Sequence, residues 1–265
     1  MGARKTGLDI SAFSLDGSDL LATLTSVSIA INGVEVNGSG IADQFVTAIW
    51  AGGKGTITAK LNHQTSGAAS TNLNVTAWSV GGTSYVGDLR SGSIKITNPS
   101  TEVKGLSDKW SYPQAVGGRS MEISGQLMVP AATVLNALMT KASSATVSDH
   151  TLAFTSTIGG DTFAVDTILL NATHSAERGG VQQLDVQLKS SGTPSGTGSG
   201  IYTVAITGDA LLSIVLDTEA GQYGTGGAAL VALVTSMDIT FSDGAVVEVS
   251  LTLEVQGQPT VTTSS

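Results

Sequence analysis

The residues that could carry out chemistry are few and widely spaced in this sequence of 265 residues. There is no cysteine, which excludes disulfide bonds, thiolate metal ligands and a cysteine nucleophile. The three histidines, His63, His150 and His174, lie far apart, and none has a second histidine or a carboxylate at helical ligand spacing on a predicted helix. We therefore interpret them as surface or loop residues and predict no metal site.

Two glycine-containing segments also fall short of a catalytic or cofactor-binding motif. In "AGGKGT", residues 51–56, Lys54 is followed by Gly55 rather than by serine or threonine, which indicates a glycine-rich hairpin tip and not a phosphate loop. In "GGDTFAVD", the odd separation of Asp161 and Asp166 places the two carboxylates on opposite faces of a strand. No G-x-S-x-G elbow occurs. The sequence thus predicts no catalytic residue, no cofactor and no enzymatic activity.

The three tryptophans, Trp50, Trp78 and Trp110, leave one binding function open. Exposed tryptophans could stack on sugar rings, which would make the protein a carbohydrate-binding or adhesin β-sandwich module. Because large aromatic side chains dominate the packing of cores and interfaces, we favour the interpretation that each tryptophan fills one of these.

Charge is unevenly distributed along the chain, whose net charge is −9. Residues 1–130 contain nine basic and nine acidic side chains, whereas residues 190–265 contain seven acidic side chains and no lysine or arginine. Because binding to phosphates requires clustered cations, an ordinary nucleic-acid-binding function is excluded. The acidic segment is either a solvated surface that aids solubility or a wall to which an anionic molecule must not adhere.

The composition favours β structure and a soluble protein. The chain has 33 glycines and only 12% charged residues, which suits short strands and tight turns better than helices. No apolar run of signal-peptide length follows Arg4 and Lys5, and no stretch of about 18 apolar residues occurs. We therefore expect synthesis in the cytoplasm and no membrane association.

Alternation of apolar and polar residues with a period of two is the dominant pattern, and it predicts half-buried strands. It occurs in residues 27–31 and in residues 247–255, among others. About nine to twelve strands are predicted, which is typical of an all-β sandwich or barrel. Helical spacing predicts one short flanking helix in residues 130–141 and a second short helix or helical turn in residues 41–50.

The chain is long enough for two domains of ordinary size. We predict one β domain in residues 1–130 and a second in residues 131–265. The Ser- and Gly-rich residues 189–200 cannot pack a core and are predicted to be a linker-like surface loop, and residues 63–72 a shorter one.

Residues 166–194 and residues 231–259 share one pattern, which is a strand, a polar turn, an alternating strand and a final Gly-x-Pro. Aligned without a gap, they have five identities in 29 positions: Gly179/Gly244, Val181/Val246, Leu188/Leu253, Gly192/Gly257 and Pro194/Pro259. Either a domain is duplicated, or hairpins of this type simply look alike.

The N-terminal block, residues 8–64, resembles the opening of bacteriophage tail tube (major tail) proteins. The resemblance rests on a lead-in, a strand, a glycine-containing hairpin stretch, a short acidic helical turn and a return strand, which here are residues 9–17, 27–31, 34–40, 42–50 and 52–61. "SGSIKITNPS", residues 91–100, is similar to the closing motif of such domains. The resemblance covers residues 1–130 by motif and the rest of the chain by pattern.

This resemblance implies a β-sandwich with a flanking helix, whose subunits form six-fold rings and contribute strands to an inter-subunit β-barrel. The rings would stack into the hollow tail tube of a virion, through which phage DNA is delivered. The chain would then hold two tube-like domains, or one with a decorating sandwich. Its partners would be copies of itself, as a hexamer or a pseudo-hexameric trimer, and other phage tail proteins. Synthesis would take place in the cytoplasm of the host bacterium.

Two sets of residues are candidates for these roles. The long hairpin from Val27 to about Leu61 is the candidate for contact with the next subunit, through Val34, Val36, Gly38, Gly40, Gly52, Gly53 and Gly55. An anionic bore would let DNA pass without specific binding, and the candidate lumen-facing carboxylates are Asp209, Asp217, Glu219, Asp238 and Asp243. A tail-terminator or head-decoration protein, which forms one closed oligomer, is the alternative within the virion.

Overall fold

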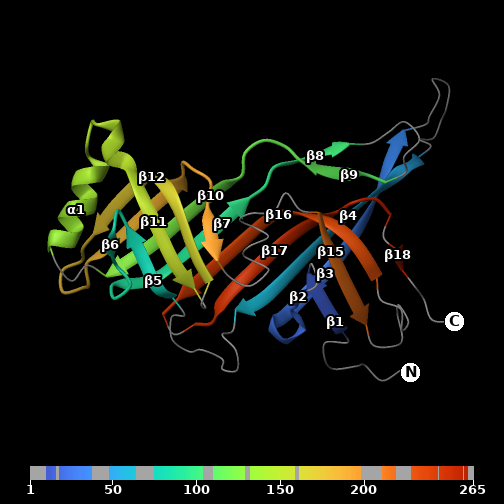
Figure 1. Cartoon of the computed structure of the whole chain (residues 1–265), viewed down its shortest axis with the longest axis horizontal. Coiled ribbons are helices and arrows are strands. Elements are labelled where there is room, and N and C mark those ends of the chain that lie inside the picture. The colour runs from blue at the N-terminus through green and yellow to red at the C-terminus, as the bar shows by residue number, and fades with distance from the viewer. Residues whose placement is uncertain are drawn as a thin grey trace.

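The computed structural model describes residues 10–15, 18–37, 48–63, 75–103, 110–128, 132–158, 161–197, 211–218, 228–243, 245–258 and 260–261. Most of them lie in antiparallel strands of one large sheet, which confirms the all-β prediction. The molecule is elongated, and its first and last described strands, β1 (Ile10–Leu15) and β18 (Thr260–Val261), lie in the same half of it (Figure 1).

The strands form two groups, which we name the split unit and the inserted unit. The split unit is built from both ends of the chain: β1 (Ile10–Leu15), β2 (Ser18–Asp19), β3 (Leu24–Asn37), β4 (Ala48–His63), β15 (Leu211–Thr218), β16 (Ala228–Ser242), β17 (Val247–Val255) and β18 (Thr260–Val261). The inserted unit lies between them in sequence: β5 (Val75–Val80), β6 (Thr83–Ser84), β7 (Leu89–Thr97), β10 (Ser120–Met128), β11 (Thr151–Ile158), β12 (Asp161–Ser175), β13 (Gln183–Ser190) and β14 (Ser195–Thr197). In Figure 1 the inserted unit is on the left and the split unit on the right.

The two units have the same strand order. The split unit runs β2-β1-β15-β16-β17-β4-β3, with β18 beside β16, and the inserted unit runs β6-β5-β11-β12-β13-β10-β7, with β14 beside β12. Interruptions of the strand register also recur at a constant offset of 65 in residue number. The interrupted residues of the two units match in three pairs: Ser11 with Thr76, Thr25 with Arg90, and Leu170 with Thr235. A bulge inserts one residue at a defined place in a ladder, so three matched bulges identify the units as two copies of one fold.

The sequences of the two units agree most clearly in their first strands, and not in the Gly-x-Pro segments described above. Residues 10–31 and residues 75–96 align at the same offset of 65, with identities at Ala12/Ala77, Ser14/Ser79, Gly17/Gly82, Leu24/Leu89, Ser26/Ser91, Ser28/Ser93, Ile29/Ile94 and Ile31/Ile96. Their backbones agree as well, since Leu20 N donates to Phe13 O at 2.9 Å and Tyr85 N donates to Trp78 O at 2.8 Å. The repeat seen in residues 166–194 and 231–259 therefore belongs to a repeat that spans the fold.

The two units are joined edge to edge. The C-terminal half of β16 pairs with β7 in antiparallel register, from Ser236↔Thr97 to Ser242↔Ser91. The strands β3, β4, β17, β16, β7, β10, β13 and β12 therefore form one continuous sheet. We call the β16–β7 pairing the internal joint.

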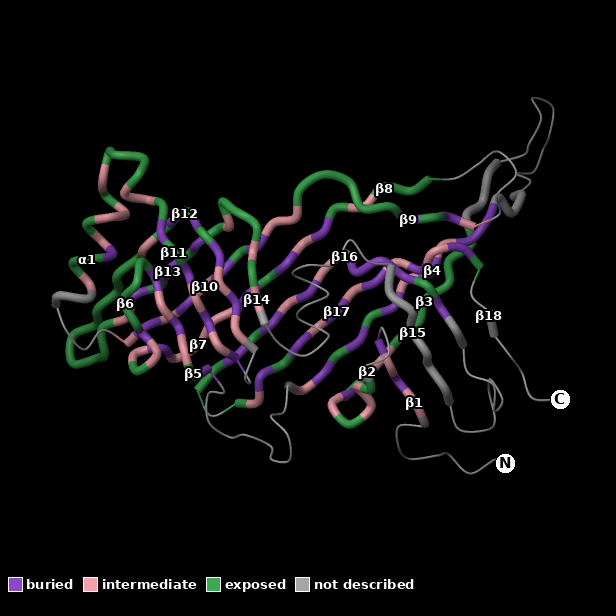
Figure 2. Tube along the Cα trace, viewed as in Figure 1, coloured by how far each residue is buried: buried purple, intermediate pink, exposed green. Residues whose placement is uncertain are grey.

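One continuous core runs through both units. Alternate residues of the strands are buried, as in β17 and β10, which Figure 2 shows as purple bands along each strand. Trp78 of the inserted unit makes edge-to-face contacts with Phe154, at 4.8 Å between ring centroids, and with Phe241 of the split unit, at 5.4 Å. These rings carry the core across the internal joint. Trp78 is 2% exposed, which confirms that this tryptophan fills a core.

Helix α1 (Ala132–Ala142) confirms the helix predicted in residues 130–141. The only other helical segments among the described residues are short 3-10 turns, Leu21–Thr23 and Val147–His150. The second predicted helix is wrong at its end, because β4 begins at Ala48, and residues 41–47 lie outside the described residues. The loop predicted in residues 189–200 is shorter than expected, since β13 continues to Ser190 and β14 pairs with β12.

The division into residues 1–130 and 131–265 stays a prediction about domains. Strands on the two sides of it pair with each other, since β10 lies beside β13 and β4 lies beside β17. Pairing within the sheet therefore follows the split and inserted units.

A separate hairpin crosses from the inserted unit to the split unit. Strands β8 (Ser100–Val103) and β9 (Tyr112–Ala115) form it, and in Figure 1 it runs along the top of the molecule. We call it the arm. It is fixed at Gly53 of β4, whose carbonyl accepts a hydrogen bond of 3.1 Å from Ser111 N and whose Cα faces the ring of Trp110.

Replacing Gly53 with alanine should loosen the arm. A Cβ at this position would lie 2.6 Å from Cζ3 of Trp110, so the indole must move, at a cost of about 1–3 kcal/mol of unfolding free energy. Hydrogen exchange should rise in residues 110–115. Gly118→Ala is the matched control, because its Cβ would meet nothing within 4 Å. Equal exchange in both variants would contradict the anchoring role of Gly53.

Candidate assembly surface

The hairpin of β3 and β4 is the longest among the described residues, and no described strand pairs with the outer side of β3. Its strands pair from Leu24↔Leu61 to Asn37↔Ala48, which confirms the predicted hairpin. Among the described residues β3 pairs only with β4, so no described strand lies on its other side. Ile29 is 39% exposed and Ile31 is 52% exposed, which contradicts the prediction of a half-buried strand here.

The predicted hairpin residues fall into three groups. Val34 and Val36 lie in β3, where they pair with Gly52 and Ile49. Gly38 and Gly40 lie outside the described residues. The third group, Gly52, Gly53 and Gly55, lies within β4.

The prediction that "AGGKGT" forms a hairpin tip is wrong, because Gly52, Gly53 and Gly55 are buried strand residues. Gly52 has a φ of 143°, next to the register shift opposite Val34 and Glu35. A Cβ at Gly55 would lie 2.9 Å from Cβ of Val255. These glycines permit a bulge and close packing against other segments of the chain, and both are known reasons for a glycine within a strand.

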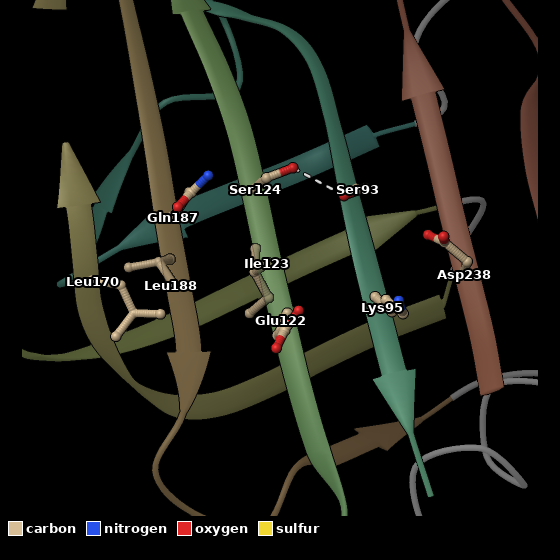
Figure 3. A pocket seen from close by; sticks show the side chains of 9 residues that line it. All are labelled: Ser93, Lys95, Glu122, Ile123, Ser124, Leu170, Gln187, Leu188 and Asp238. Carbon is tan, nitrogen blue, oxygen red and sulfur yellow. Dashed lines mark hydrogen bonds between the residues drawn. The ribbon is translucent and has the colours of Figure 1, made fainter. Parts of the chain in front are cut away.

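The face of the continuous sheet that is opposite to the core is polar. At its centre is a shallow depression of about 220 Å³, which Figure 3 shows with residues from β16, β7, β10, β13 and β12. Within it Ser93 Oγ and Ser124 Oγ lie 2.9 Å apart, as the dashed line marks, and Lys95 stands beside Asp238 in the register of the internal joint.

Acidic and basic side chains are mixed on this polar face. Strand alternation places on it, among the described residues, Lys54, Lys60, Lys95, Lys189, Glu122, Asp185, Asp238, Glu248 and Glu254. Lys189 Nζ lies 3.8 Å from Glu122 Oε1, and Gln126 Nε2 donates to Asp185 Oδ1 at 3.2 Å. The face therefore carries no cluster of one sign.

Of the five carboxylates predicted to face a lumen, only Asp238 and Asp243 have described side chains. Asp238 lies on the polar face and is half-buried. Asp243 follows β16 and accepts a hydrogen bond of 2.9 Å from Arg90 Nη1. Asp217 lies in β15, and Asp209 and Glu219 lie outside the described residues.

A charged cluster joins the arm to the sheet. Lys54 Nζ lies 2.6 Å from Glu102 Oε1 of the arm and 3.1 Å from Glu254 Oε1 of β17. Ser100 Oγ donates to the second oxygen of Glu254 at 2.7 Å. The hydrogen bond to Glu102 raises the pKa of Lys54, burial opposes this, and Glu254 adds to the increase.

The free energy of unfolding should fall as the pH rises through the alkaline range. The pKa of Lys54 is raised above its ordinary value of 10.5, so its contribution is fully present below pH 10.5 and is lost as the pH rises through the raised pKa. Burial raises the pKa of Tyr85 above 10.0, so the folded state keeps a proton that the unfolded state releases. Denaturant titrations between about pH 9 and 11 would measure the decrease. Tyr85→Phe should flatten it, and a constant free energy in the parent protein would contradict both assignments.

The structure places the remaining chemical candidates apart from one another. His150 Nε2 lies 2.9 Å from Ser144 O, and His174 is exposed on β12. Trp110 lies against Gly53, and the side chains of His63 and Trp50 lie outside the described set. In the described ranges no three His, Asp or Glu side chains could together hold a metal ion. No helix there is long and apolar enough to cross a membrane.

Sequence reasoning missed the edge residues Ile29 and Ile31 as functional candidates because alternation marks them as core. The signal that could have found them is the offset of 65. It aligns them with Ile94 and Ile96 and raises the question of why one strand would have a partner that its copy lacks.

Comparison with known proteins yields partial likenesses. No protein-family profile matches the chain, and no curated protein matches it. One similar solved chain, from a structure of the virion of a native gene transfer agent (GTA) particle, is 19% identical with a TM-score of 0.36, over 42% of this chain and 85% of that chain. Another, from the tail of an empty GTA particle computed with helical refinement and C6 symmetry, is 18% identical with a TM-score of 0.34, over 42% of this chain and 83% of that chain.

Proposed function

We propose that the chain is a structural, non-enzymatic protein of a phage-like virion tail, made in the host cytoplasm, which self-assembles into stacked rings that form a hollow tail tube. The observation that carries the proposal is the free edge of β3, a strand of 14 residues with Ile29 and Ile31 exposed. An exposed apolar edge is a template for another chain, and a closed ring removes it. The N-terminal motifs that resemble tail tube proteins support the same function, since their residues form β3 and β4.

The polar face of the continuous sheet is suited to line the bore of such a tube. Its lysines alternate with carboxylates, and two of the lysines, Lys54 and Lys189, lie within 4 Å of a carboxylate oxygen. Phosphates are retained by clustered, unpaired cations that displace counterions. DNA would therefore pass along this face without specific binding, and other tail proteins would cap the ends of the tube.

Electron microscopy of the purified protein, with mass photometry over a range of concentrations, tests this function. Hollow filaments whose length grows with concentration are the expected result. A single closed oligomer at every concentration would instead identify a tail-terminator or head-decoration protein. A monomer at every concentration would overturn the assembly function, and binding to a glycan array would then point to a carbohydrate-binding module.

A further inference from the structure

The internal joint shows how one copy of the repeated unit pairs with the next. In it β7 of the inserted unit lies beside the C-terminal half of β16 of the split unit. Ile94 and Ile96 of β7 are 0% and 4% exposed, and they pair with Ile239 and Met237, which are both fully buried. The joint therefore completes the core as well as the sheet.

Among the described residues, the two strands that correspond to the joint have no partner on the side where the joint would form. β3 is the copy of β7, and Ile29 and Ile31 are the copies of the buried Ile94 and Ile96. β12 is the copy of β16. Its pairing with β11 ends at Ile168, so beyond this residue it pairs only with β13 among the described residues.

The end of β12 is accessible to a strand. Asn171, Thr173, His174 and Ser175 are exposed, and Ala172 is half-buried at the margin of the core. In β16 the corresponding inward-facing positions are Met237 and Ile239, which are buried and have β7 beside them. One end of the sheet thus offers exposed isoleucines and the other an uncovered strand.

We propose that β3 of one chain pairs with β12 of the next chain in the antiparallel register of the internal joint. Shifting the joint by the same offset of 65 gives the partners Asn171↔Asn32, Ala172↔Ile31, Thr173↔Ala30, His174↔Ile29 and Ser175↔Ser28. The second copy would cover Ile29 and Ile31 as β16 covers Ile94 and Ile96. The inter-chain joint follows from the internal repeat and not from the tube function.

The repeat also sets the number of chains in a ring, and this step rests on the proposed function. Each chain supplies two copies of the unit, so a ring of six tube units contains three chains. Head-to-tail pairing of one surface with a different surface generates a ring when the rotation closes. The internal joint then alternates with the inter-chain joint around the ring.

Disulfide trapping tests the register, because the chain has no cysteine of its own. In Ala30→Cys/Thr173→Cys the two thiols face each other across the proposed joint, and oxidation with diamide should link chains. Lys95→Cys/Asp238→Cys is the matched positive control, since these residues are the same pair in the internal joint and should link within one chain. Ala30→Cys/His174→Cys is the negative control, because a shift of one residue places the thiols on opposite faces.

Denaturing electrophoresis of oxidised assemblies should show one, two and three linked chains of 26.7 kDa each and nothing larger. No inter-chain link, when the positive control closes, would overturn the joint, and so would equal linking by the negative control. A ladder that continues beyond three chains would overturn the ring count. Filaments that form without inter-chain links would support the tube function and refute the joint. Linked rings that never stack would support the joint and refute the tube function.

Discussion

Replacing Ile31 with lysine should weaken assembly strongly while the chain stays folded. Ile31 is 52% exposed in the single chain, so a charged side chain there finds water and costs little stability. In an assembled ring the same position would be covered, and both the loss of apolar burial, about 1.5–3 kcal/mol, and the burial of a charge would oppose association. The concentration needed for assembly should rise by about tenfold or more.

The copy of this residue in the other unit provides the matched comparison. Ile96→Lys places the same charge in the same local sequence, but Ile96 is 4% exposed beside Met237. It should lower the thermal midpoint sharply, whereas Ile31→Lys should leave the midpoint nearly unchanged. Circular dichroism melts and mass photometry of both variants measure the two effects. Normal assembly of Ile31→Lys would rule out β3 as the assembling edge.

Replacing Trp78 with alanine should lower the free energy of unfolding by about 3–5 kcal/mol, a large share of the stability of an ordinary domain. The indole contacts Phe154 and Phe241, so its loss leaves a cavity at the point where the cores of the two units meet. Trp78→Phe should cost much less, because phenylalanine is the residue at the equivalent position, Phe13, of the split unit. Denaturant titrations measure both values.

The glycine beside this ring offers a second test of the same packing. A Cβ on Gly125 would lie 3.1 Å from Cζ2 of Trp78, and the copy of Gly125 in β4 is Ala59. Gly125→Ala alone should cost about 1–3 kcal/mol, and much less in a Trp78→Phe background, where the smaller ring leaves room. If the two changes are additive, the indole and Gly125 do not form the packed pair described.

Much of the fold could be predicted from the sequence because its signals are local. Period-two alternation identified strands such as residues 247–255, and helical spacing placed α1 within two residues of its observed limits. The glycines of residues 51–56 were misassigned because a turn and a close packing contact require the same residue. Their role depends on Trp110 and Val255, which are distant in sequence.

The candidate site could be predicted only in part. The hairpin of β3 and β4 follows from its two alternating segments, but the choice of lumen-facing carboxylates relied on a run of acidic residues along the chain. In the fold, Asp238 and Asp243 separate, one to the polar face beside Lys95 and the other to Arg90. The face of a sheet on which a charged side chain lies is determined by the register of strand pairing and not by the run of acidic residues along the chain.

By itself the sequence determined the class of structure, the positions of most strands and of the helix, and the lack of a cysteine-based site, because each depends on residue type and short-range spacing. Only the tertiary structure decided that one unit is inserted into the other and which strands are left at the edges. "SIAI" at Ser28 and "SIKI" at Ser93 are nearly the same, yet the isoleucines of the first are exposed and those of the second are buried. The difference arises because β16, which lies far beyond β7 along the chain, pairs with β7, whereas β3 pairs only with β4 among the described residues.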